Sequence, residues 1–362
     1  MAAQAGQAAA AGPIDMRRVE VVAPNLKRRL SGVTSTIVQL VPLQARELAI
    51  VTFGPGLPAD LPRMRWWQLP ALLARPERKP FRIWHARRNT EMVAGLVLRD
   101  VFRAPLRLLF TSAAQRRHKP FTRWLIRRMD AVVATSARSG SFLQVPHRVI
   151  MHGVDTKLFH PPRDPEDIWA ATGLPGQYGI GCFGRIRHQK GTDLFIDAMI
   201  ELLPRYPDWT AVILGRATAE HHAFAEDLKH RVHKAGLSQR IRFLGEVPDV
   251  RPWYRRLSLY VAPSRNEGFG LTPLEAMASG AAVVASDAGA YAELIVPEQT
   301  GMVVPAGDGA ALSAAIEPYL ADPALAARQG EAGRAHVAGR FALAGEAAAL
   351  REVYEDLWER GR

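Results

Sequence analysis

The sequence predicts an α/β protein of two doubly wound domains, each with a parallel sheet covered by helices on both faces. The length of 362 residues suits two domains of ordinary size. Apolar runs of strand length alternate with runs of helical pattern through both halves, which favours parallel sheets. A turn-rich segment at 161–165, Pro-Pro-Arg-Asp-Pro, separates two such series and is the expected linker.

The expected elements follow the chain in two series. The first has strands at 19–23, 47–53, 81–85, 106–111 and 131–135, with helices at 89–99 and 121–129. The second has strands at 178–183, 210–214, 241–244, 259–262 and 282–286, with helices at 192–203, 219–235, 250–256 and 273–279. Helices at 310–320 and 341–359 end the chain. Doubly wound domains bind ligands in a crevice at the carboxyl ends of their strands, so functional residues are expected in the loops that follow them.

Composition limits the class of protein. With 48% hydrophobic and 23% charged residues, the chain is globular. The single cysteine, Cys182, lies in an apolar run, so we expect a buried packing residue and no internal disulfide. No apolar stretch reaches the roughly 18 residues of a spanning helix, and residues 1–12 lack the features of a signal peptide. Residues 1–15 are expected to be a disordered extension, with translation starting at Met1 or Met16.

Positive charge is concentrated in the first half of the chain. The net charge is +12; residues 1–160 hold 26 Lys and Arg against 9 Asp and Glu, whereas the remainder holds 21 against 26. This asymmetry indicates an anionic partner for the first half: nucleic acid, an anionic membrane surface or a phosphorylated substrate. The alternative is a basic surface that only keeps the protein soluble and binds no partner. The pI of about 10.3 keeps a nucleic-acid-binding protein as a rival, but no RNA-binding signature, zinc spacing or clear helix-turn-helix supports one.

The strongest functional signal follows the expected strand at 259–262. It reads Glu267-Gly268-Phe269-Gly270-Leu271-Thr272-Pro273-Leu274-Glu275. The glycines allow a ligand to approach the backbone. Thr272 is expected to cap the following helix, with Pro273 at its first position and Glu275 completing a capping box. Such a helix start suits a phosphate, and Glu267 suits sugar hydroxyls. Helix capping by Glu275 beside a solvated Glu267 is the purely structural alternative.

A second loop follows the expected strand at 178–183. Glycines stand at both ends, Gly184 and Gly191, with cations between them. Arg185 offers a planar fork of donors and Lys190 a point charge, so the loop suits a diphosphate; a solvated basic loop is the alternative. Because no cluster of carboxylates or histidines has convincing ligand spacing, we expect no metal and no other cofactor.

From about Met16 to Trp358 the sequence resembles the retaining glycosyltransferases of family 4, which have the GT-B fold: two Rossmann-like domains facing a central cleft. Their hallmark of Glu, seven residues and Glu is matched by Glu267 and Glu275, with the Gly-Phe-Gly core between them. The resemblance implies that Glu267 contacts the donor hexose, Glu275 the nucleotide ribose, and Arg185 with Lys190 the pyrophosphate. Donor binding is also expected of Gly184, Gly268, Phe269, Gly270, Leu271 and Thr272.

The same resemblance implies the domain limits. The first domain is expected at 16–163 and takes the acceptor, and the second, at 164–340, binds the nucleotide-sugar. The last segment, 341–362, is expected to cross back as a helix onto the first domain, with Val353 and Leu357 in the contact. The stretch 151–159 resembles the family's hinge entry, with His152 in place of Asn.

Two shorter matches lie in the first half. Gly32 partly matches a Gly-rich turn near the donor phosphates and the acceptor, although Ser31 stands where many relatives have another glycine. His85 matches a histidine that faces the donor sugar, although relatives often carry a second histidine nearby, where Ala86 stands here. A simple turn and a structural histidine are the respective alternatives.

The basic first half indicates the kind of acceptor. Residues 121–128 place Trp124 beside Arg123, Arg127 and Arg128 on a helix, which suits an anionic membrane surface; burial of Trp124 in the core is the alternative. The runs 110–117 and 121–130 are similar to bacterial lipopolysaccharide core mannosyltransferases. That similarity implies GDP-mannose as donor, a Kdo-bearing lipid A precursor as acceptor, and a cytoplasmic enzyme at the inner face of the membrane. Transfer from a UDP-sugar to a soluble acceptor is the alternative.

Overall fold

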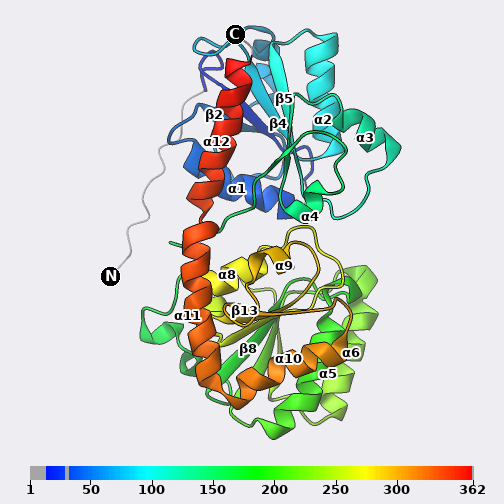
Figure 1. The fold of residues 1–362 in the computed structure, drawn as a ribbon, viewed down its shortest axis with the longest axis vertical. Coiled ribbons are helices and arrows are strands. Elements are labelled where there is room, and N and C mark those ends of the chain that lie inside the picture. Colours follow the sequence, from blue (N-terminus) through cyan, green and yellow to red (C-terminus); the bar gives the residue numbers. More distant parts are fainter. Residues whose placement is uncertain (1–13, 29–31, 361–362) are drawn as a thin grey trace. The chain divides into compact units, whose positions relative to one another are not determined.

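The computed structural model describes residues 14–28 and 32–360, which belong to two compact units (Figure 1). The first unit comprises residues 1–151 together with 343–362, and the second comprises 152–342. The expected extension at 1–15 lies outside the described residues up to position 13, as does Ser31.

The first unit is built on a parallel sheet of seven strands in the order β3-β2-β1-β4-β5-β6-β7. The strands are β1 (Val21–Pro24), β2 (Ile50–Phe53), β3 (Arg63–Met64), β4 (Arg82–Ala86), β5 (Leu106–Ser112), β6 (Ala131–Ala134) and β7 (Arg148–Val149). The order reverses between β1 and β4. In a doubly wound sheet the loops after those two strands diverge there and leave a crevice for a ligand.

Helices cover this sheet on both faces. They are α1 (Gly32–Gln44), η1 (Trp66–Leu73), α2 (Asn89–Leu96), η2 (Val97–Val101), α3 (Pro120–Ile126), α4 (Ala137–Gly140) and α12 (Leu343–Glu359). The last of these, α12, lies beside α1 on one face (Figure 1). Its apolar residues, Val353 and Leu357 among them, join Val21, Ile37 and Ile83 in one buried cluster. The end of the chain therefore completes the core of the first unit.

The second unit repeats the plan with six parallel strands in the order β10-β9-β8-β11-β12-β13. The strands are β8 (Tyr178–Phe183), β9 (Trp209–Leu214), β10 (Ile241–Gly245), β11 (Leu259–Ala262), β12 (Ala282–Ser286) and β13 (Gly301–Val304). Its principal helices are α5 (Thr192–Leu202), α6 (His222–Lys234), α7 (Arg251–Arg256), α8 (Thr272–Ala278), α9 (Tyr291–Leu294), α10 (Gly309–Ala321) and α11 (Pro323–Arg340). The order reverses between β8 and β11, so the loops after these strands are the expected ligand site.

The boundary between the units lies at Met151 and His152, so the predicted boundary at residues 163 and 164 is wrong. The segment after Met151 packs on the second unit. Its Val154 amide donates to the Phe341 carbonyl at 2.8 Å, and the ring of Phe159 packs against Tyr254 with centroids 5.8 Å apart. The Pro-rich run at 161–165 is thus a surface turn of the second unit.

The sequence pattern also missed a long helix, α11, and three short strands at sheet edges, β3, β7 and β13. Glycines within α11 weaken its helical signal, because glycine costs about 1 kcal/mol relative to alanine inside a helix. Tertiary packing explains them. A Cβ on Gly330 would lie 2.1 Å from the carbonyl oxygen of Gly280, and one on Gly333 would lie 3.0 Å from Met277 Cγ.

Candidate functional site

A pocket opens in the second unit where its strand order reverses. Residues at the ends of β8 and β11 and in the loops after them line it, together with the first residues of α5, α8 and α9: Cys182, Phe183, Gly184, Arg185, Lys190, Thr192, Tyr260, Val261, Ala262, Pro263, Ser264, Thr272 and Tyr291. Cys182 is buried as expected, and burial raises the pKa of its thiol to about 12, so it stays a neutral packing residue. The lining includes both predicted cations, Arg185 and Lys190, so the two share one pocket.

Two glycines give the 184–191 loop its path. Gly184 has φ of +137° and Gly191 has φ of +68°, which are conformations that favour glycine. A Cβ on Gly191 would lie 1.9 Å from the carbonyl oxygen of Pro263, so only glycine lets this loop approach the one after β11. Close contact between the two loops brings the cations toward the Glu267 motif.

Lys190 meets that motif directly, because its Nζ forms an ion pair with Glu267 Oε2. The other oxygen, Oε1, accepts from the Gly268 amide at 3.0 Å. Both side chains are about one-fifth exposed, so a ligand in the pocket can reach them. Arg185 is exposed beside them and has no ion-pair or hydrogen-bond partner for its side chain among residues 14–28 and 32–360. The site thus combines a paired cation, an unpaired cation and a carboxylate.

A half-buried clamp, which sequence reasoning missed, fixes the Lys190 loop. Arg265 binds Asp193 through two hydrogen bonds of 2.8 and 2.7 Å, and its Nη1 also donates to the His188 carbonyl at 2.8 Å. Its amide donates to the Gln189 carbonyl at 2.9 Å. Burial opposes ionisation of Asp193, but these Arg265 contacts outweigh it and keep the pKa of Asp193 below its usual value. The only sequence signal was an arginine two residues before Glu267.

The Glu267 loop is shaped by close contacts with α9. Gly270 has φ of +87°, and a Cβ there would lie 2.2 Å from the Tyr291 ring. Phe269 is buried, with its ring edge-on to that of His152 at 4.9 Å, so the expected hinge residue packs on the motif. A Cβ on Gly289 would lie 3.0 Å from Glu267 Cβ. Sequence reasoning missed Tyr291 and Gly289.

The predicted capping box at α8 is wrong. Leu271 is the N-cap residue, and its helical dihedrals (φ −76°, ψ −23°) start the helix at Thr272 without a side-chain cap. The Thr272 hydroxyl instead interacts with Tyr260 and Tyr291. The Glu275 side chain does not cap the helix either, because its Oε2 accepts from the Tyr254 hydroxyl at 2.8 Å.

Glu275 is joined to the pocket wall through that tyrosine. The Tyr254 ring packs on Phe183, a pocket residue, with centroids 4.8 Å apart. Burial raises the pKa of Glu275, and the Tyr254 hydrogen bond acts in the opposite direction. Within the described part of the chain nothing donates to the second oxygen, Oε1. One oxygen is thus fixed while the other can accept from a ligand.

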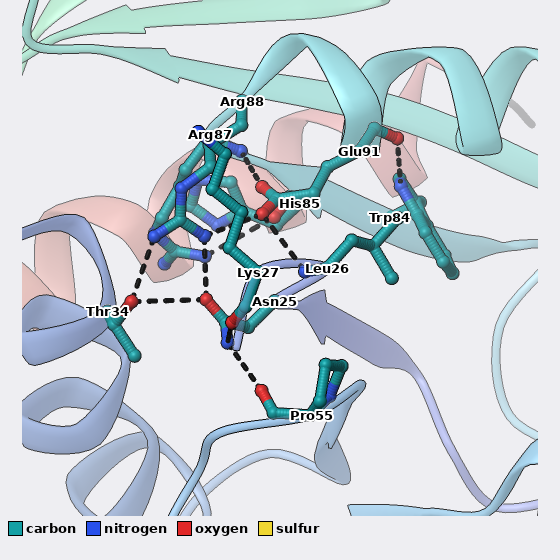
Figure 2. Close-up of polar contacts among 10 residues, drawn as sticks. All are labelled: Asn25, Leu26, Lys27, Thr34, Pro55, Trp84, His85, Arg87, Arg88 and Glu91. Carbon is teal, nitrogen blue, oxygen red and sulfur yellow. Dashed lines mark hydrogen bonds and ion pairs between the residues drawn. The ribbon is translucent and has the colours of Figure 1, made fainter. Parts of the chain in front are cut away.

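A second polar cluster lies in the first unit, at the reversal between β1 and β4 (Figure 2). Asn25 follows β1, and Arg88 and Glu91 follow β4. Arg88 Nη1 donates to Asn25 Oδ1 at 2.6 Å and to Glu91 Oε1 at 2.9 Å. Glu91 is fully buried, and its Oε2 accepts from the Arg87 amide at 2.8 Å. The cluster ties the two strand ends together.

The structure does not support the predicted donor contact of His85. The side chain is fully buried, with Nδ1 2.8 Å from the Tyr354 hydroxyl and Nε2 2.7 Å from the Thr111 hydroxyl. Both ring nitrogens are hydrogen-bonded to hydroxyls of the first unit, so His85 is a structural histidine. Gly32, the other predicted residue in this unit, is the first residue of α1 and has no heavy atom within 4 Å of a Cβ built on it.

The predicted basic, aromatic surface is present on α3. Trp124 is 47% and Phe121 57% exposed, so core burial of Trp124 is wrong. The two rings stack with centroids 6.0 Å apart, and the Arg128 guanidinium lies 3.8 Å from the Trp124 ring centroid. Leu125 and Ile126 face the core instead. The helix therefore presents aromatic rings and cations on its exposed face.

Residues 14–28 and 32–360 contain neither a metal-binding cluster nor a membrane-spanning helix. No group of three or more His, Cys, Asp or Glu side chains gathers as metal ligands do. Among the same residues, no helix is both long enough and apolar enough to cross a bilayer.

Comparisons with known proteins agree with this architecture. The family model "Glycosyl transferases group 1" matches residues 177–322. The chain is 67% identical over 344 residues to the lipopolysaccharide core biosynthesis mannosyltransferase LpcC of Rhizobium leguminosarum bv. viciae, covering 95% of this chain and 98% of that protein. It is 54% identical over 349 residues to LpsB, with the same description, of Rhizobium meliloti (strain 1021), covering 95% and 99%. The structure of Anabaena HepE with UDP and glucose matches with a TM-score of 0.78 at 20% identity, covering 93% of this chain and 100% of HepE.

The two doubly wound units have the GT-B fold, and the relatives of high identity show that the chain is a glycosyltransferase. The chain belongs to the glycosyl transferases group 1 family. The predicted fold class of two Rossmann-like domains, the enzyme class and the resemblance to bacterial lipopolysaccharide core mannosyltransferases are thereby confirmed.

Proposed function

We propose that this enzyme transfers mannose from GDP-mannose to an anionic, lipid-linked glycan of the lipopolysaccharide inner core, with retention of the anomeric configuration. The observation that carries the proposal is the ion pair of Lys190 with Glu267, since Lys190 and Arg185 line one pocket. The two relatives named for core mannosyl transfer, each matched over almost its whole length, support the choice of sugar and acceptor.

In this proposal each donor group has its own partner. Arg185, whose side chain lacks a partner within the described residues, and Lys190 bind the diphosphate, where their charge stabilises the leaving group. Glu267 accepts hydrogen bonds from the mannose hydroxyls. The open Oε1 of Glu275 accepts from the ribose, while Tyr254 holds Oε2.

The chemical step needs little from the protein beyond charge and position. The acceptor hydroxyl attacks the anomeric carbon on the face from which the diphosphate leaves, which retains the configuration. The departing phosphate oxygen takes the proton of that hydroxyl. Arg185 and Lys190, which line the pocket, would balance the charge of the diphosphate, so we expect the reaction to need no metal ion or other cofactor.

The exposed face of α3 is the proposed contact with the membrane that carries the acceptor. Phe121 and Trp124 offer apolar rings, and Arg123, Arg127 and Arg128 offer positive charge. Aromatic and basic side chains on one helix face suit the interface of an anionic leaflet. The enzyme would then work at the cytoplasmic face of the inner membrane, without any contact with nucleic acid.

Transfer of radiolabelled mannose to a Kdo-bearing lipid A precursor tests the function directly. A panel of GDP- and UDP-sugars identifies the donor first, because a ligand that binds only the folded state raises its melting temperature. GDP-mannose should raise it most. A larger shift with a UDP-sugar, together with transfer from it to a soluble acceptor, would establish the alternative activity.

Site variants test the roles of the paired groups. Glu267→Gln and Lys190→Gln should each lower turnover at least ~100-fold with little change in melting temperature, because each removes charge from the proposed reaction centre. Glu331→Gln and Lys234→Gln make the same chemical changes at exposed positions of the same unit and should keep normal turnover. Near-normal turnover of both site variants would contradict these roles.

A further inference from the structure

Residues 25–28, which follow β1, are held firmly in place although Lys27 and Arg28 are exposed cations. Asn25 is fully buried, and its Nδ2 donates to the Lys27 carbonyl at 2.8 Å and to the Pro55 carbonyl at 2.7 Å. The loop after β2 packs directly on it. A Cβ on Gly54 would lie 2.1 Å from the Asn25 carbonyl oxygen, and one on Gly56 would lie 2.5 Å from that of Arg28. Both glycines have positive φ, and they let the backbone of the loop after β2 approach the backbone of residues 25–28 closely.

The other end of the Asn25 amide is fixed as well (Figure 2). Its Oδ1 accepts from Arg88 Nη1 at 2.6 Å and from the Thr34 hydroxyl at 3.2 Å. Arg88 in turn is paired with the buried Glu91 at 2.9 Å. The Asn25 amide therefore donates to two carbonyl oxygens and accepts from a guanidinium. An aspartate at this position could not make these contacts, because an ionised carboxylate has no hydrogen to donate. Asn25 therefore links the ends of β1 and β4 with the loop after β2.

This support presents Lys27 and Arg28 to solvent. Both residues are exposed, and within the described part of the chain neither side chain has an ion-pair or hydrogen-bond partner. The Arg88 charge, by contrast, is matched by Glu91 inside the cluster. Residues 27 and 28 follow β1 at the strand-order reversal, which is where doubly wound sheets bind ligands. Cations on a pre-ordered backbone bind an anion with a smaller loss of entropy than cations on a flexible loop.

We propose that Lys27 and Arg28 form a binding site for an anionic group of the acceptor, a sugar carboxylate or a phosphate ester, with Asn25 and Arg88 as positioning residues. The inference rests on the proposed function for the nature of the acceptor. The ligand chemistry itself follows from two adjacent unpaired cations: Arg28 offers a planar fork of donors for two oxygens, and Lys27 a point charge.

The first experiment measures acceptor binding to the full-length enzyme without donor, so that it does not depend on catalysis. The double variant Lys27→Gln/Arg28→Gln should weaken binding of the Kdo-bearing lipid A precursor at least about tenfold, which corresponds to ~1.4 kcal/mol. Its salt dependence should also become shallower. Arg46→Gln is the matched control: Arg46 is exposed between α1 and β2, at the amino ends of the strands, and its loss should leave affinity unchanged.

Acceptor variants distinguish the two sources of negative charge. If the site binds a carboxylate, an acceptor whose carboxyl groups have been reduced should bind the wild type weakly. Its affinity should then be about that of the intact acceptor for the double variant. If the site binds a phosphate, a dephosphorylated acceptor should behave in the same way. Equal affinity of the wild type and the double variant for the intact acceptor would overturn the proposal. So would a loss of binding matched by an equal loss on plain anionic vesicles, because that result assigns the two cations to the lipid surface.

Asn25→Ala tests the positioning role. It leaves both cations in place but frees the Lys27 carbonyl, so acceptor affinity should fall several-fold while the melting-temperature shift with GDP-mannose stays that of the wild type. Unchanged acceptor affinity would refute the role of Asn25. If the wild type transfers no mannose yet binds the anionic glycan through Lys27 and Arg28, the proposed function fails and this site stands.

Discussion

At the scale of single residues, burial decides what His85 does. The imidazole lies between β5 and α12, with a hydroxyl at each ring nitrogen. Burial, helped by the nearby charge of Arg87, lowers the pKa of His85 well below 6.5. A neutral ring at pH 7 fits its place, because a buried imidazolium would lose its hydration. His85 thus joins β4 to α12 and stabilises the first unit.

The depressed pKa predicts a pH effect on stability. The unfolded chain takes up the His85 proton near pH 6.5, and the folded chain only at lower pH, so this contribution is present above pH 6.5 and is lost as pH falls below it. His85→Gln should flatten the decline of unfolding free energy below pH 6.5 by up to about 1.4 kcal/mol per pH unit. Urea unfolding at pH 7.5, 6.0 and 5.0 measures this decline. The exposed His147→Gln should keep the wild-type slope, and an equally steep decline in His85→Gln would contradict the account.

Residue-scale geometry also explains how Lys190 reaches Glu267. Arg265 fastens two segments to the loop that carries Glu267: the turn before Lys190, through the His188 carbonyl, and the start of α5, through Asp193. A bidentate pair fixes direction as well as distance. The cation and the carboxylate of the site are therefore placed by a second ion pair next to them, Arg265–Asp193.

At the scale of elements, α11 shows a helix whose packing outweighs its propensity. Gly330 meets the Gly280 backbone, and Gly333 meets Met277 on α8. Each glycine weakens the isolated helix, yet each allows an approach that any Cβ would prevent. Close packing of α11 against α8 and β12 then secures α8, the helix that carries Glu275.

Two alanine substitutions in α11 should therefore have opposite effects. Gly330→Ala places a Cβ 2.1 Å from a backbone oxygen and should destabilise the second unit by roughly 1–3 kcal/mol. Gly339→Ala meets nothing within 4 Å and should stabilise it by up to about 1 kcal/mol through helix propensity. Thermal or urea unfolding of both variants checks the signs; equal effects would show that propensity alone governs this helix.

At the scale of the whole molecule, the first unit is discontinuous in sequence. Its core includes Leu350, Val353, Tyr354 and Trp358 of α12, which follow the entire second unit along the chain. The chain enters and leaves the second unit at adjacent points, because Val154 and Ala342 form a bridge. The first unit can therefore complete its core only after the last helix has been made.

This connectivity predicts how fragments behave. A fragment of residues 152–342 should unfold cooperatively on heating, because its core is contiguous in sequence. A fragment of residues 1–151 should lack a cooperative transition, and fusing residues 343–362 to its end through a flexible linker should restore one. Circular dichroism on heating measures all three. A cooperative transition of the 1–151 fragment alone would show that α12 is dispensable.

The sequence by itself determined the two parallel sheets, most of their central strands and the loops that carry Glu267, Glu275, Arg185 and Lys190. These features are local: apolar periodicity, glycines at turns and charged residues just after strands. The sequence pattern did not predict α11 or the edge strands β3, β7 and β13. Short strands and glycine-containing helices are stabilised by residues far away in the sequence.

Only the tertiary structure decided which groups meet. The Lys190–Glu267 contact, the Arg265 clamp and the Asn25 cluster join residues 63 to 77 positions apart, and the burial of His85 depends on a helix more than 250 residues away. No local pattern encodes such contacts, because the energy of a polar side chain depends on the partners and the solvent that folding brings to it.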